Sequence, residues 1–473
     1  MLFTLISFIF LLLVLIFVHE LGHFLAAKLL GVRVEKFSLG FPPKAWSKKI
    51  GETEYQLAWL PLGGFVSLCG ETPGSPIAPE DIPHSFSHKP LWVKAIVVAA
   101  GPLFNIIFAI LALWLVNFSA GAQHLAPFVG TIEENSPAIK AGLQANDQIT
   151  AINKQPIQYF TEVQDSLDNS QGQSLAFTLI RDGRTLDLTL TPERKEWLNA
   201  FGMTASGWSL GFSPRVRPIV GEVIDDKPAA KAGLATGDLI LSIDGIKTPD
   251  WTDIIKTIRR KHQTEVVDGE TIHQKPSPMA VEVLRDGQTL TLTITPVLEP
   301  TYEVDGKTAF VPILGFKPKQ EFLRESLGVF SSFAVGLNET WQVTKLTVET
   351  FVRLFQSKIS VKVLGGPIMI AEVAGKKARE GLLDFIWVMA LISVNLAIIN
   401  LVPLPILDGG QLFFFLIEGL RRRPLSVRFR EISQWVGATA MVALMVLVFY
   451  NDIHRWVTRL SGPAVAQETI SDK

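Results

Sequence analysis

The sequence predicts a polytopic α-helical membrane protein with two tandem α+β domains outside the membrane. Two observations predict this class. Four apolar segments approach the roughly 20 residues needed to span a bilayer, and they lie near Leu2–Leu30, Leu91–Phe118, Leu382–Leu401 and Trp435–Tyr450. The long region between the second and third segments contains an internal duplication with strand-like patterns. The first segment lacks a basic start and is too long for a signal peptide, so we expect it to be a membrane helix.

Composition excludes several function classes. The net charge of −1 is no basis for bulk nucleic-acid binding. The chain has a single cysteine, Cys69, so an intramolecular disulfide framework and a cysteine-based zinc site are both excluded. Any metal ligands must therefore come from histidine, aspartate or glutamate.

The basic residues predict the topology, because cytoplasmic loops carry an excess of lysine and arginine. Basic residues gather between spans one and two and between spans three and four, at Lys28, Arg33, Lys36, Lys44, Lys48, Lys49, Lys89, Lys94, Arg421, Arg422, Arg423, Arg428 and Arg430. Both stretches should be cytoplasmic. Both termini and the region 120–380 should then lie on the opposite side.

A His-Glu-x-x-His motif, from His19 to His23, falls inside the first apolar span. On a helix this spacing places two imidazoles on one face, where they bind zinc, and Glu20 lies beside the metal as a general base. A chance match is the competing interpretation, but such a match should fall on a polar, soluble helix. Ionisable residues inside a membrane span are costly and mark function by default.

A third ligand is expected from the segment 400–410 (NLVPLPILDGG), since catalytic zinc usually takes three protein ligands and a water. Its two prolines end the third span, because proline lacks the amide donor and fixes φ. Asp408 then sits on irregular backbone at membrane depth, which is tolerated only inside protein or beside a water-filled cavity. The predicted topology brings it to the same leaflet as His19 and His23. A capping aspartate in a Pro-Gly turn is the alternative.

The middle region is a duplication. Residues 127–153 (PFVGTIEENSPAIKAGLQANDQITAIN) reappear as residues 218–244 (PIVGEVIDDKPAAKAGLATGDLILSID), and the second copy carries extra residues around Lys261–Pro278. Each copy shows alternating strand patterns, and a short helix is expected near each Ala-Gly-Leu. Asp147 and Asp238 are expected to be turn and capping residues.

The repeated phrase Pro-Ala-x-x-Ala-Gly-Leu-x-x-x-Asp-x-Ile resembles bacterial PDZ domains, circularly permuted as in the HtrA type. Asn146 stands where the second copy has the usual glycine, Gly237. PDZ domains bind extended peptides, often C-termini, by strand addition. Inert spacers are the alternative interpretation.

The whole chain resembles the site-2 protease family. The matching motifs are His19-Glu20-x-x-His23, Asn400-x-x-Pro403-x-Pro405-x-Leu407-Asp408-Gly409, Gly101–Asn105, Pro61–Val66 and the two PDZ-like domains between spans two and three. The resemblance implies a zinc ion (Zn²⁺) held by His19, His23 and Asp408, with one position left for water. Glu20 would take the proton of that water and return it to the leaving amine. Asn400 would donate to the substrate backbone or oxyanion, or else would bond across helices.

The resemblance also implies a substrate and a place. The enzyme would cleave the transmembrane segment of single-span proteins in the bacterial inner membrane, with the active site near the cytoplasmic side. Candidate substrates are a pre-cleaved anti-sigma factor and remnant signal peptides, and the PDZ-like domains would gate access. A membrane-dipping hairpin at Ala58–Glu71, containing Gly63, Gly64 and Phe65, would pair with the unwound substrate as an added strand. A cytoplasmic hairpin without a substrate role is the alternative.

Apolar spacing from Leu323 to Phe355 predicts an amphipathic helix that rests on the membrane surface or packs against the PDZ-like pair. The expected organisation is span one at 1–30, a cytoplasmic loop at 31–90, span two at 91–118, PDZ-like domains at 120–215 and 216–318, the amphipathic helix and connector at 319–381, span three at 382–410 and span four at 432–452.

Two other classes compete with a protease. In a non-catalytic adaptor the PDZ-like pair would bind peptides and the metal would be structural, but structural zinc usually has four protein ligands and three are found here. A transporter predicts repeats among the membrane spans, whereas this repeat lies outside them.

Overall fold

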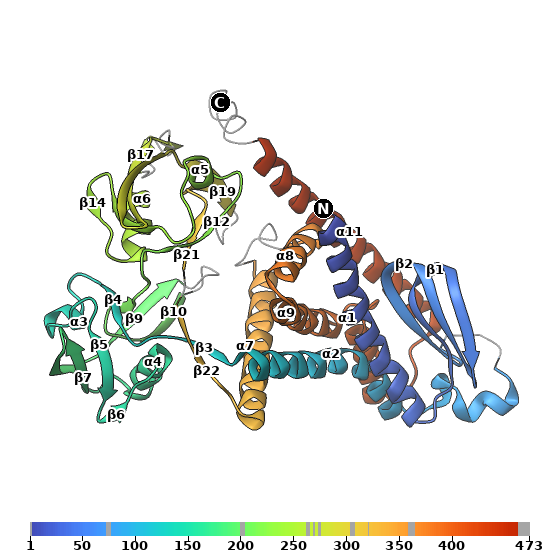
Figure 1. Ribbon diagram of the computed structural model, residues 1–473. Helices are drawn as coiled ribbons and strands as arrows, with labels where there is room; N and C mark the ends of the chain where they lie inside the picture. Colours follow the sequence, from blue (N-terminus) through green and yellow to red (C-terminus); the bar gives the residue numbers. More distant parts are fainter. Residues whose placement is uncertain are drawn as a thin grey trace. The chain divides into compact units, whose positions relative to one another are not determined.

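The computed structural model describes residues 2–71, 77–198, 204–261, 265–267, 270–272, 276–302, 308–319, 321–357 and 365–461. The chain forms two compact units, which are coloured along the sequence in Figure 1. Unit 1 comprises Met1–Ala122 and Ser326–Arg455, and unit 2 comprises Gln123–Glu325 and Trp456–Lys473.

Among the described residues of unit 1, four helices are long and apolar enough to cross a membrane, as the sequence predicts. They are α1 (Leu2–Leu29), α2 (Leu91–Ala120), α9 (Leu382–Leu401) and α11 (Val427–Ser461), with the apolar part of α11 at Val427–His454. The fourth helix begins and ends beyond the predicted 432–452. The third ends at Leu401, as predicted, because Pro403 and Pro405 cannot extend the helical hydrogen bonding; the rest of the region 382–410 leads into the next helix.

The part of unit 1 that the structure describes has three further α-helices: α7 (Val329–Phe355), α8 (Pro367–Glu380) and α10 (Asp408–Arg421). Two short 3-10 turns, η1 (Pro79–His84) and η2 (Phe86–His88), precede α2. The buried Asp452 of α11 accepts hydrogen bonds from the amides of Gly366 and Ile368, at 3.0 and 2.9 Å. It thereby satisfies amides at the start of α8 that have no partner within the helix.

Helix α7 starts later than the predicted Leu323. Residues Phe322–Glu325 form strand β22, which pairs with β3 (Ala122–Leu125). The helix packs against α2, where a Cβ on Gly336 would lie 2.8 Å from the amide nitrogen of Trp114. Thus α7 packs on the candidate membrane helix α2, a contact that neither of the two predicted placements included.

Strands β1 (Val34–Ile50) and β2 (Thr53–Leu68) form one hairpin, drawn in blue in Figure 1. Each strand bends, so the hairpin folds into four antiparallel runs: residues 36–39 pair with both 64–67 and 54–57, and 54–57 also pair with 46–49. The run 64–67 is therefore an edge of this sheet. The predicted hairpin within Ala58–Glu71 is wrong, because these residues pair with β1 rather than with one another.

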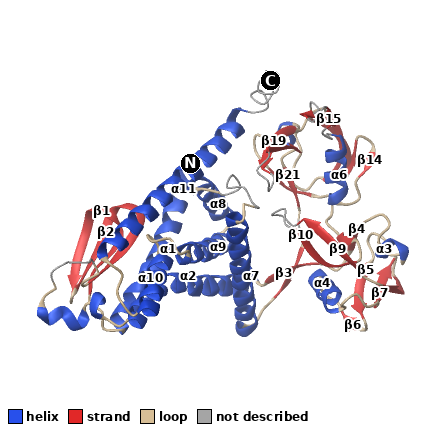
Figure 2. Ribbon diagram, turned by 180° about the vertical axis from the view of Figure 1, so that it is seen from behind, coloured by secondary structure: helices blue, strands red, loops and turns tan. Residues whose placement is uncertain are grey.

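Unit 2 contains two modules with the same element order, and their strands are red in Figure 2. Repeat 1 consists of β4 (Val129–Ile132), α3 (Pro137–Lys140), β5 (Gln148–Ile152), β6 (Gln155–Pro156), α4 (Phe160–Asn169), β7 (Leu175–Arg181), β8 (Arg184–Leu190), β9 (Glu193–Leu198), β10 (Thr204–Ser209) and β11 (Phe212–Pro214). Repeat 2 consists of β12 (Val220–Val223), α5 (Pro228–Lys231), β13 (Leu239–Ile243), β14 (Ile246–Lys247), α6 (Trp251–Lys261), β17 (Met279–Arg285), β18 (Gln288–Ile294), β19 (Val297–Tyr302), β20 (Thr308–Ile313) and β21 (Phe316–Pro318). The extra residues of repeat 2 include β15 (Glu265–Val267) and β16 (Glu270–Ile272).

The two repeats also share sheet topology and core. The sheet order is β6-β5-β7-β8 in repeat 1 and β14-β13-β17-β18 in repeat 2. The cores rest on equivalent buried strand residues, such as Ile149 and Phe177 in repeat 1 and Ile240 and Val281 in repeat 2. The short helices α3 and α5 lie just before each Ala-Gly-Leu, as predicted.

Each repeat buries an aspartate at the equivalent turn. Asp147 and Asp238, both 1% exposed, accept hydrogen bonds of 2.8 Å from the amides of Gln144 and Ala235. This confirms the turn role predicted from the sequence. Each aspartate also forms an ion pair, with Arg181 or Arg285 respectively, which the sequence did not predict.

The turn before each aspartate has the same geometry in both copies. Asn146 has a φ of 73° and Gly237 a φ of 97°. Asparagine is one of the few residues that tolerate this left-handed region. The replacement of glycine by Asn146 therefore leaves the turn intact.

Candidate metal centre

Two ligands of the candidate metal centre come from α1. Between Ser7 and Lys28 this helix is apolar apart from the His-Glu-x-x-His segment, so the histidines are the main polar groups on a surface that packs against other helices. His19 and His23 lie four residues apart and so project from the same face. Close packing against α2 holds this face in place, because a Cβ on Gly22 would lie 2.3 Å from the carbonyl oxygen of Ala100.

The third ligand comes from the break between α9 and α10. Helix α9 ends at Leu401, the chain turns through Pro403 and Pro405, and Asp408 is the first residue of α10. The next two residues must be glycines for the turn to close. A Cβ on Gly409 or Gly410 would lie 2.2 or 2.1 Å from a backbone carbonyl oxygen.

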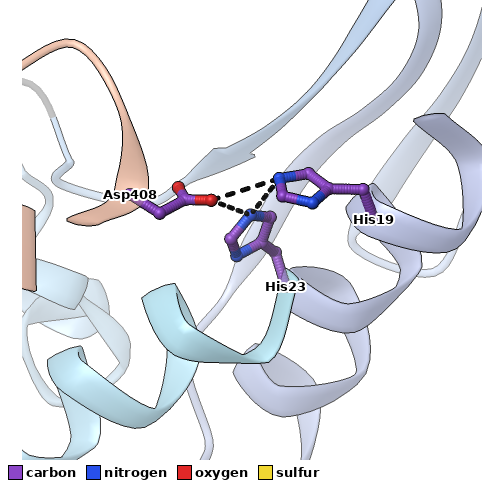
Figure 3. A group of neighbouring side chains, drawn as sticks. All are labelled: His19, His23 and Asp408. Carbon is purple, nitrogen blue, oxygen red and sulfur yellow. Dashed lines mark hydrogen bonds and ion pairs between the residues drawn. The ribbon is translucent and has the colours of Figure 1, made fainter. Parts of the chain in front are cut away.

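The three side chains converge on one point (Figure 3). Asp408 Oδ2 lies 3.2 Å from His19 Nε2 and 3.7 Å from His23 Nε2, and the two Nε2 atoms are 3.3 Å apart. Tetrahedral zinc, with bonds of about 2.0–2.1 Å, would place its ligand atoms roughly 3.3 Å apart. Both the donor set and its spacing therefore fit zinc. Among the described residues, these three side chains lie close enough together to hold a metal ion.

The ligand side chains are shielded from solvent, with only 11%, 14% and 16% of the His19, His23 and Asp408 side chains exposed. The outer nitrogen of each histidine meets a group on α2. His23 Nδ1 lies 2.9 Å from the carbonyl oxygen of Val97, and His19 Nδ1 lies 3.3 Å from Nδ2 of Asn105. Outer partners of this kind fix the orientation and tautomer of metal-binding histidines.

Glu20 lies between the candidate ligands and the β1–β2 hairpin. The carboxyl group is next to the amide of Val66, and a Cβ on Gly64 would lie 3.1 Å from Glu20 Cγ. The edge run of the hairpin thus faces the residue that the sequence predicts as general base. A side chain larger than glycine at position 64 would push this edge away from α1.

The predicted substrate-binding residues lie in two places, Asn400 beside the candidate ligands and the others in the hairpin. Asn400 is close to the ligands, with Nδ2 3.4 Å from His19 Nε2. Phe65 belongs to the edge run and pairs with Ser38. Gly63 packs on the ring of Phe41, where an added Cβ would lie 2.1 Å from the ring, so its contact is within the hairpin.

The contribution of α2 was not predicted from the sequence. Gly101–Asn105 matches a family pattern, but that match gives none of its residues a role. In the structure, a Cβ on Gly101 would lie 2.3 Å from His23 Nε2 and 2.9 Å from His19 Cε1. The available signal was Asn105 itself, a polar residue inside an apolar span, which is costly unless it has a partner.

The other histidines show no metal-ligand spacing in the sequence, and we interpret them as ordinary residues. In the described part of the chain, His84, His88, His124 and His454 make contacts away from the cluster. His262 and His273 lie outside the described residues.

Comparisons with known proteins agree over nearly the whole chain. The sequence model of Peptidase family M50 matches residues 7–444. The chain is 36% identical to "Regulator of sigma-E protease RseP" of Salmonella typhimurium, with 96% of this chain and 99% of that protein covered. It is 34% identical to the Escherichia coli protein of the same name, with 95% and 98% covered. A Neisseria meningitidis protein whose name includes "zinc metalloprotease" is 32% identical, with 97% and 100% covered.

Proposed function

This chain belongs to peptidase family M50, the site-2 proteases, and we propose that His19, His23 and Asp408 hold its zinc ion while Glu20 acts as general base. The family consists of zinc metalloproteases, and the described residues of this chain include four helices that could span a membrane. The observation that carries the assignment is the convergence of the three ligand atoms within 4.8 Å from two separate helices. An aspartate that only capped a Pro-Gly turn would have no reason to meet both imidazoles.

When bound, zinc lowers the pKa of its water and polarises the scissile carbonyl. Glu20 is placed beside the ligands on α1, where its carboxylate takes the proton of the attacking water and delivers it to the leaving amine. Asn400, near His19, donates its amide to the substrate carbonyl as negative charge develops there. The apolar helices exclude bulk water and so strengthen each of these interactions.

The edge run of the hairpin binds the substrate in this proposal. A membrane helix has its carbonyls engaged in its own hydrogen bonds, so it must unwind before a peptide bond can be cleaved. The run 64–67 pairs with β1 on one side only, and within the described residues no strand covers its other side. An unwound substrate segment added to this side would pass in front of Glu20.

The topology follows from the basic loops. With the loops after α1 and α10 in the cytoplasm, both termini and the two repeats are periplasmic, and the protein lies in the bacterial inner membrane. His19 and His23 are near the C-terminal end of α1, so the site lies towards the cytoplasmic side. We assign a single-span membrane protein as the substrate class.

The relatives that are named regulators of sigma-E suggest a pathway. We assign a pre-cleaved anti-sigma factor as one substrate and remnant signal peptides as another. The two repeats act as PDZ-like domains that bind peptides or exclude bulky, uncut substrates. Membrane lipid surrounds unit 1, and the protein needs no nucleic acid.

Cleavage of a single-span reporter by the full-length protein in liposomes tests the proposal. We expect Glu20→Gln to lower the rate by at least about 100-fold, the smaller contribution typical of general-base catalysis, while zinc remains bound. His19→Ala and Asp408→Asn should lose both zinc and cleavage, and a zinc chelator should stop the wild type. His88→Ala is the matched control and should cut normally. Equal cleavage by all variants would reject the metal site.

A further inference from the structure

Asn105 of α2 lies fully buried beside the candidate metal centre, and one end of its amide has no partner. Nδ2 is 3.3 Å from His19 Nδ1, whereas Oδ1 is buried and makes no hydrogen bond with any described residue. A buried oxygen without a donor is costly and rare, so it needs an explanation. An asparagine that only joined two helices would be expected to have both polar ends paired.

The tautomer of His19 supplies that explanation. A histidine that binds metal through Nε2 carries its proton on Nδ1, and this proton needs an acceptor. An amide presents oxygen and nitrogen at nearly the same place after a half-turn, and the surrounding hydrogen bonds decide between the two orientations. The half-turned Asn105 would direct Oδ1 at His19 Nδ1 and so pair the orphaned oxygen.

The two histidines differ in this respect. The outer partner of His23 is the carbonyl oxygen of Val97, a main-chain group that can only accept a hydrogen bond. The outer partner of His19 is the Asn105 side chain, and it is therefore the one that a substitution can remove. Either orientation of the amide satisfies His19: as acceptor when Nε2 binds metal, and as donor when Nδ1 is bare.

The position of Asn105 is fixed by contacts from two other helices. Ser393 of α9 donates its hydroxyl to the main-chain carbonyl of Asn105 at 2.8 Å. One helical turn earlier, Gly101 packs directly on both imidazoles. These contacts hold the backbone of α2 in place at Asn105, and full burial of the side chain keeps the amide beside His19.

We propose that Asn105 is a positioning residue that accepts the Nδ1 proton of His19 and so directs His19 Nε2 at the zinc ion. This inference rests on the proposed zinc site. Loss of the outer partner of a metal ligand typically lowers metal affinity 10- to 100-fold. The size of the effect thus separates positioning from simple packing.

The test is the zinc dissociation constant of the full-length protein in detergent, measured by competition with a chromogenic chelator. The visible spectrum of the cobalt-substituted protein reports ligand geometry alongside it. Asn105→Leu keeps the branching at Cγ but removes the acceptor, and should raise the zinc Kd 10- to 100-fold and change the cobalt spectrum. Asn105→Asp keeps an acceptor oxygen, so its zinc Kd should not rise above the wild-type value by more than about three-fold.

Asn117→Leu is the matched control. Asn117 is also a buried asparagine of α2, but it bonds to Glu339 of α7 and to Leu113 rather than to a histidine. Its substitution should leave the zinc Kd and the cobalt spectrum unchanged. Equal zinc affinity in Asn105→Leu, Asn117→Leu and the wild type would overturn the inference.

Two outcomes need separate treatment. If Asn105→Leu does not fold, as judged by thermal unfolding, Asn105→Asp decides alone, and a ten-fold weaker zinc affinity in that variant overturns the inference. If the wild type binds no zinc, or if His19→Ala binds it as tightly as the wild type, the proposed zinc site itself fails. The role proposed for Asn105 is then rejected as well, and the wild-type and His19→Ala measurements show that the zinc site is the cause.

Discussion

The candidate metal centre and the two repeats assemble their key contacts over different distances in the sequence. Asn400 and His19, which meet at the metal centre, are 381 positions apart. In the repeats, Asp147 meets Arg181 across 34 positions and Asp238 meets Arg285 across 47. A disturbance in a repeat should therefore stay within that repeat, whereas a disturbance of any one of α1, α2, α9 or α10 should reach the metal centre.

The largest effect is expected from Gly101→Ala, which tests whether the centre depends on the approach of α2. The added methyl group would overlap both imidazoles, so the ligands must shift. A displacement of about 1 Å can lower activity about 100-fold. Cleavage of the reporter and the zinc Kd should both deteriorate. Gly419→Ala of α10 is the control, because its nearest neighbour would be Leu91 Cδ1 at 3.8 Å; an equal loss in both variants would contradict the prediction.

The next effect concerns the repeats. Asp238→Asn removes the charge that Arg285 pairs with. We expect the free energy of unfolding of repeat 2 to fall by about 3 kcal/mol. This is the low end of the range for a buried pair, because Arg285 is partly exposed. Asp147→Asn should do the same in repeat 1. Hydrogen exchange would check this: faster exchange should stay within the substituted repeat, and zinc affinity should not change. Faster exchange in both repeats would show that they are coupled.

A smaller, graded effect should appear with pH. Burial alone would raise the pKa of Asp238, but hydrogen bonds from Arg285 and the Ala235 amide, with the charge of Arg285, outweigh it and lower the pKa. A lowered pKa in the folded state means that the stabilisation is complete above the ordinary value of 3.8 and is lost as the pH falls below it. Hydrogen exchange of repeat 2 should therefore accelerate below about pH 3.8. Asp238→Asn should remove this acceleration at low pH. If the variant kept the pH profile of the wild type, Asp238 would not be the source of the acceleration.

The smallest effect distinguishes the two repeats from each other. Next to Gly211 of repeat 1 lie Ser136 and the Glu133 carboxylate, which pairs with Lys195, whereas next to Gly315 of repeat 2 lies Lys227. If the repeats bind peptide C-termini near Gly211 and Gly315, repeat 2 should hold the carboxylate more tightly. Lys227→Gln should weaken binding of such a peptide up to about five-fold, the limit for an exposed charge pair. A C-terminally amidated peptide is the control and should not respond.

Local patterns in the sequence were enough to predict the four apolar helices and the three candidate ligands that the structure brings together. His19 and His23 are one turn apart on any helix, and Pro403 and Pro405 force a break that leads to Asp408. The folding of β1 and β2 into four runs was not predictable, because Lys36 pairs with two distant partners and nothing local encodes that choice.

Other features depend on packing that no local pattern records. The strand Phe322–Glu325 continues the apolar spacing of the helix that follows it, and only its pairing with β3 makes it a strand. The partnership of Asn105 with His19 depends on the close crossing of α1 and α2. Arg181 and Arg285 stand at the ends of strands and precede Asp-Gly turns, so their pairing with Asp147 and Asp238 was hidden.

The slight exposure of the three ligand side chains also sets a timescale. If zinc occupies the proposed site, it should leave only when α1, α2 or α10 moves, so its release should be slower than release from a surface site. A chelator should therefore need a longer incubation to stop the wild type than to strip a surface ion. The zinc content of a preparation should then follow a change of buffer with a delay that reports these helix movements.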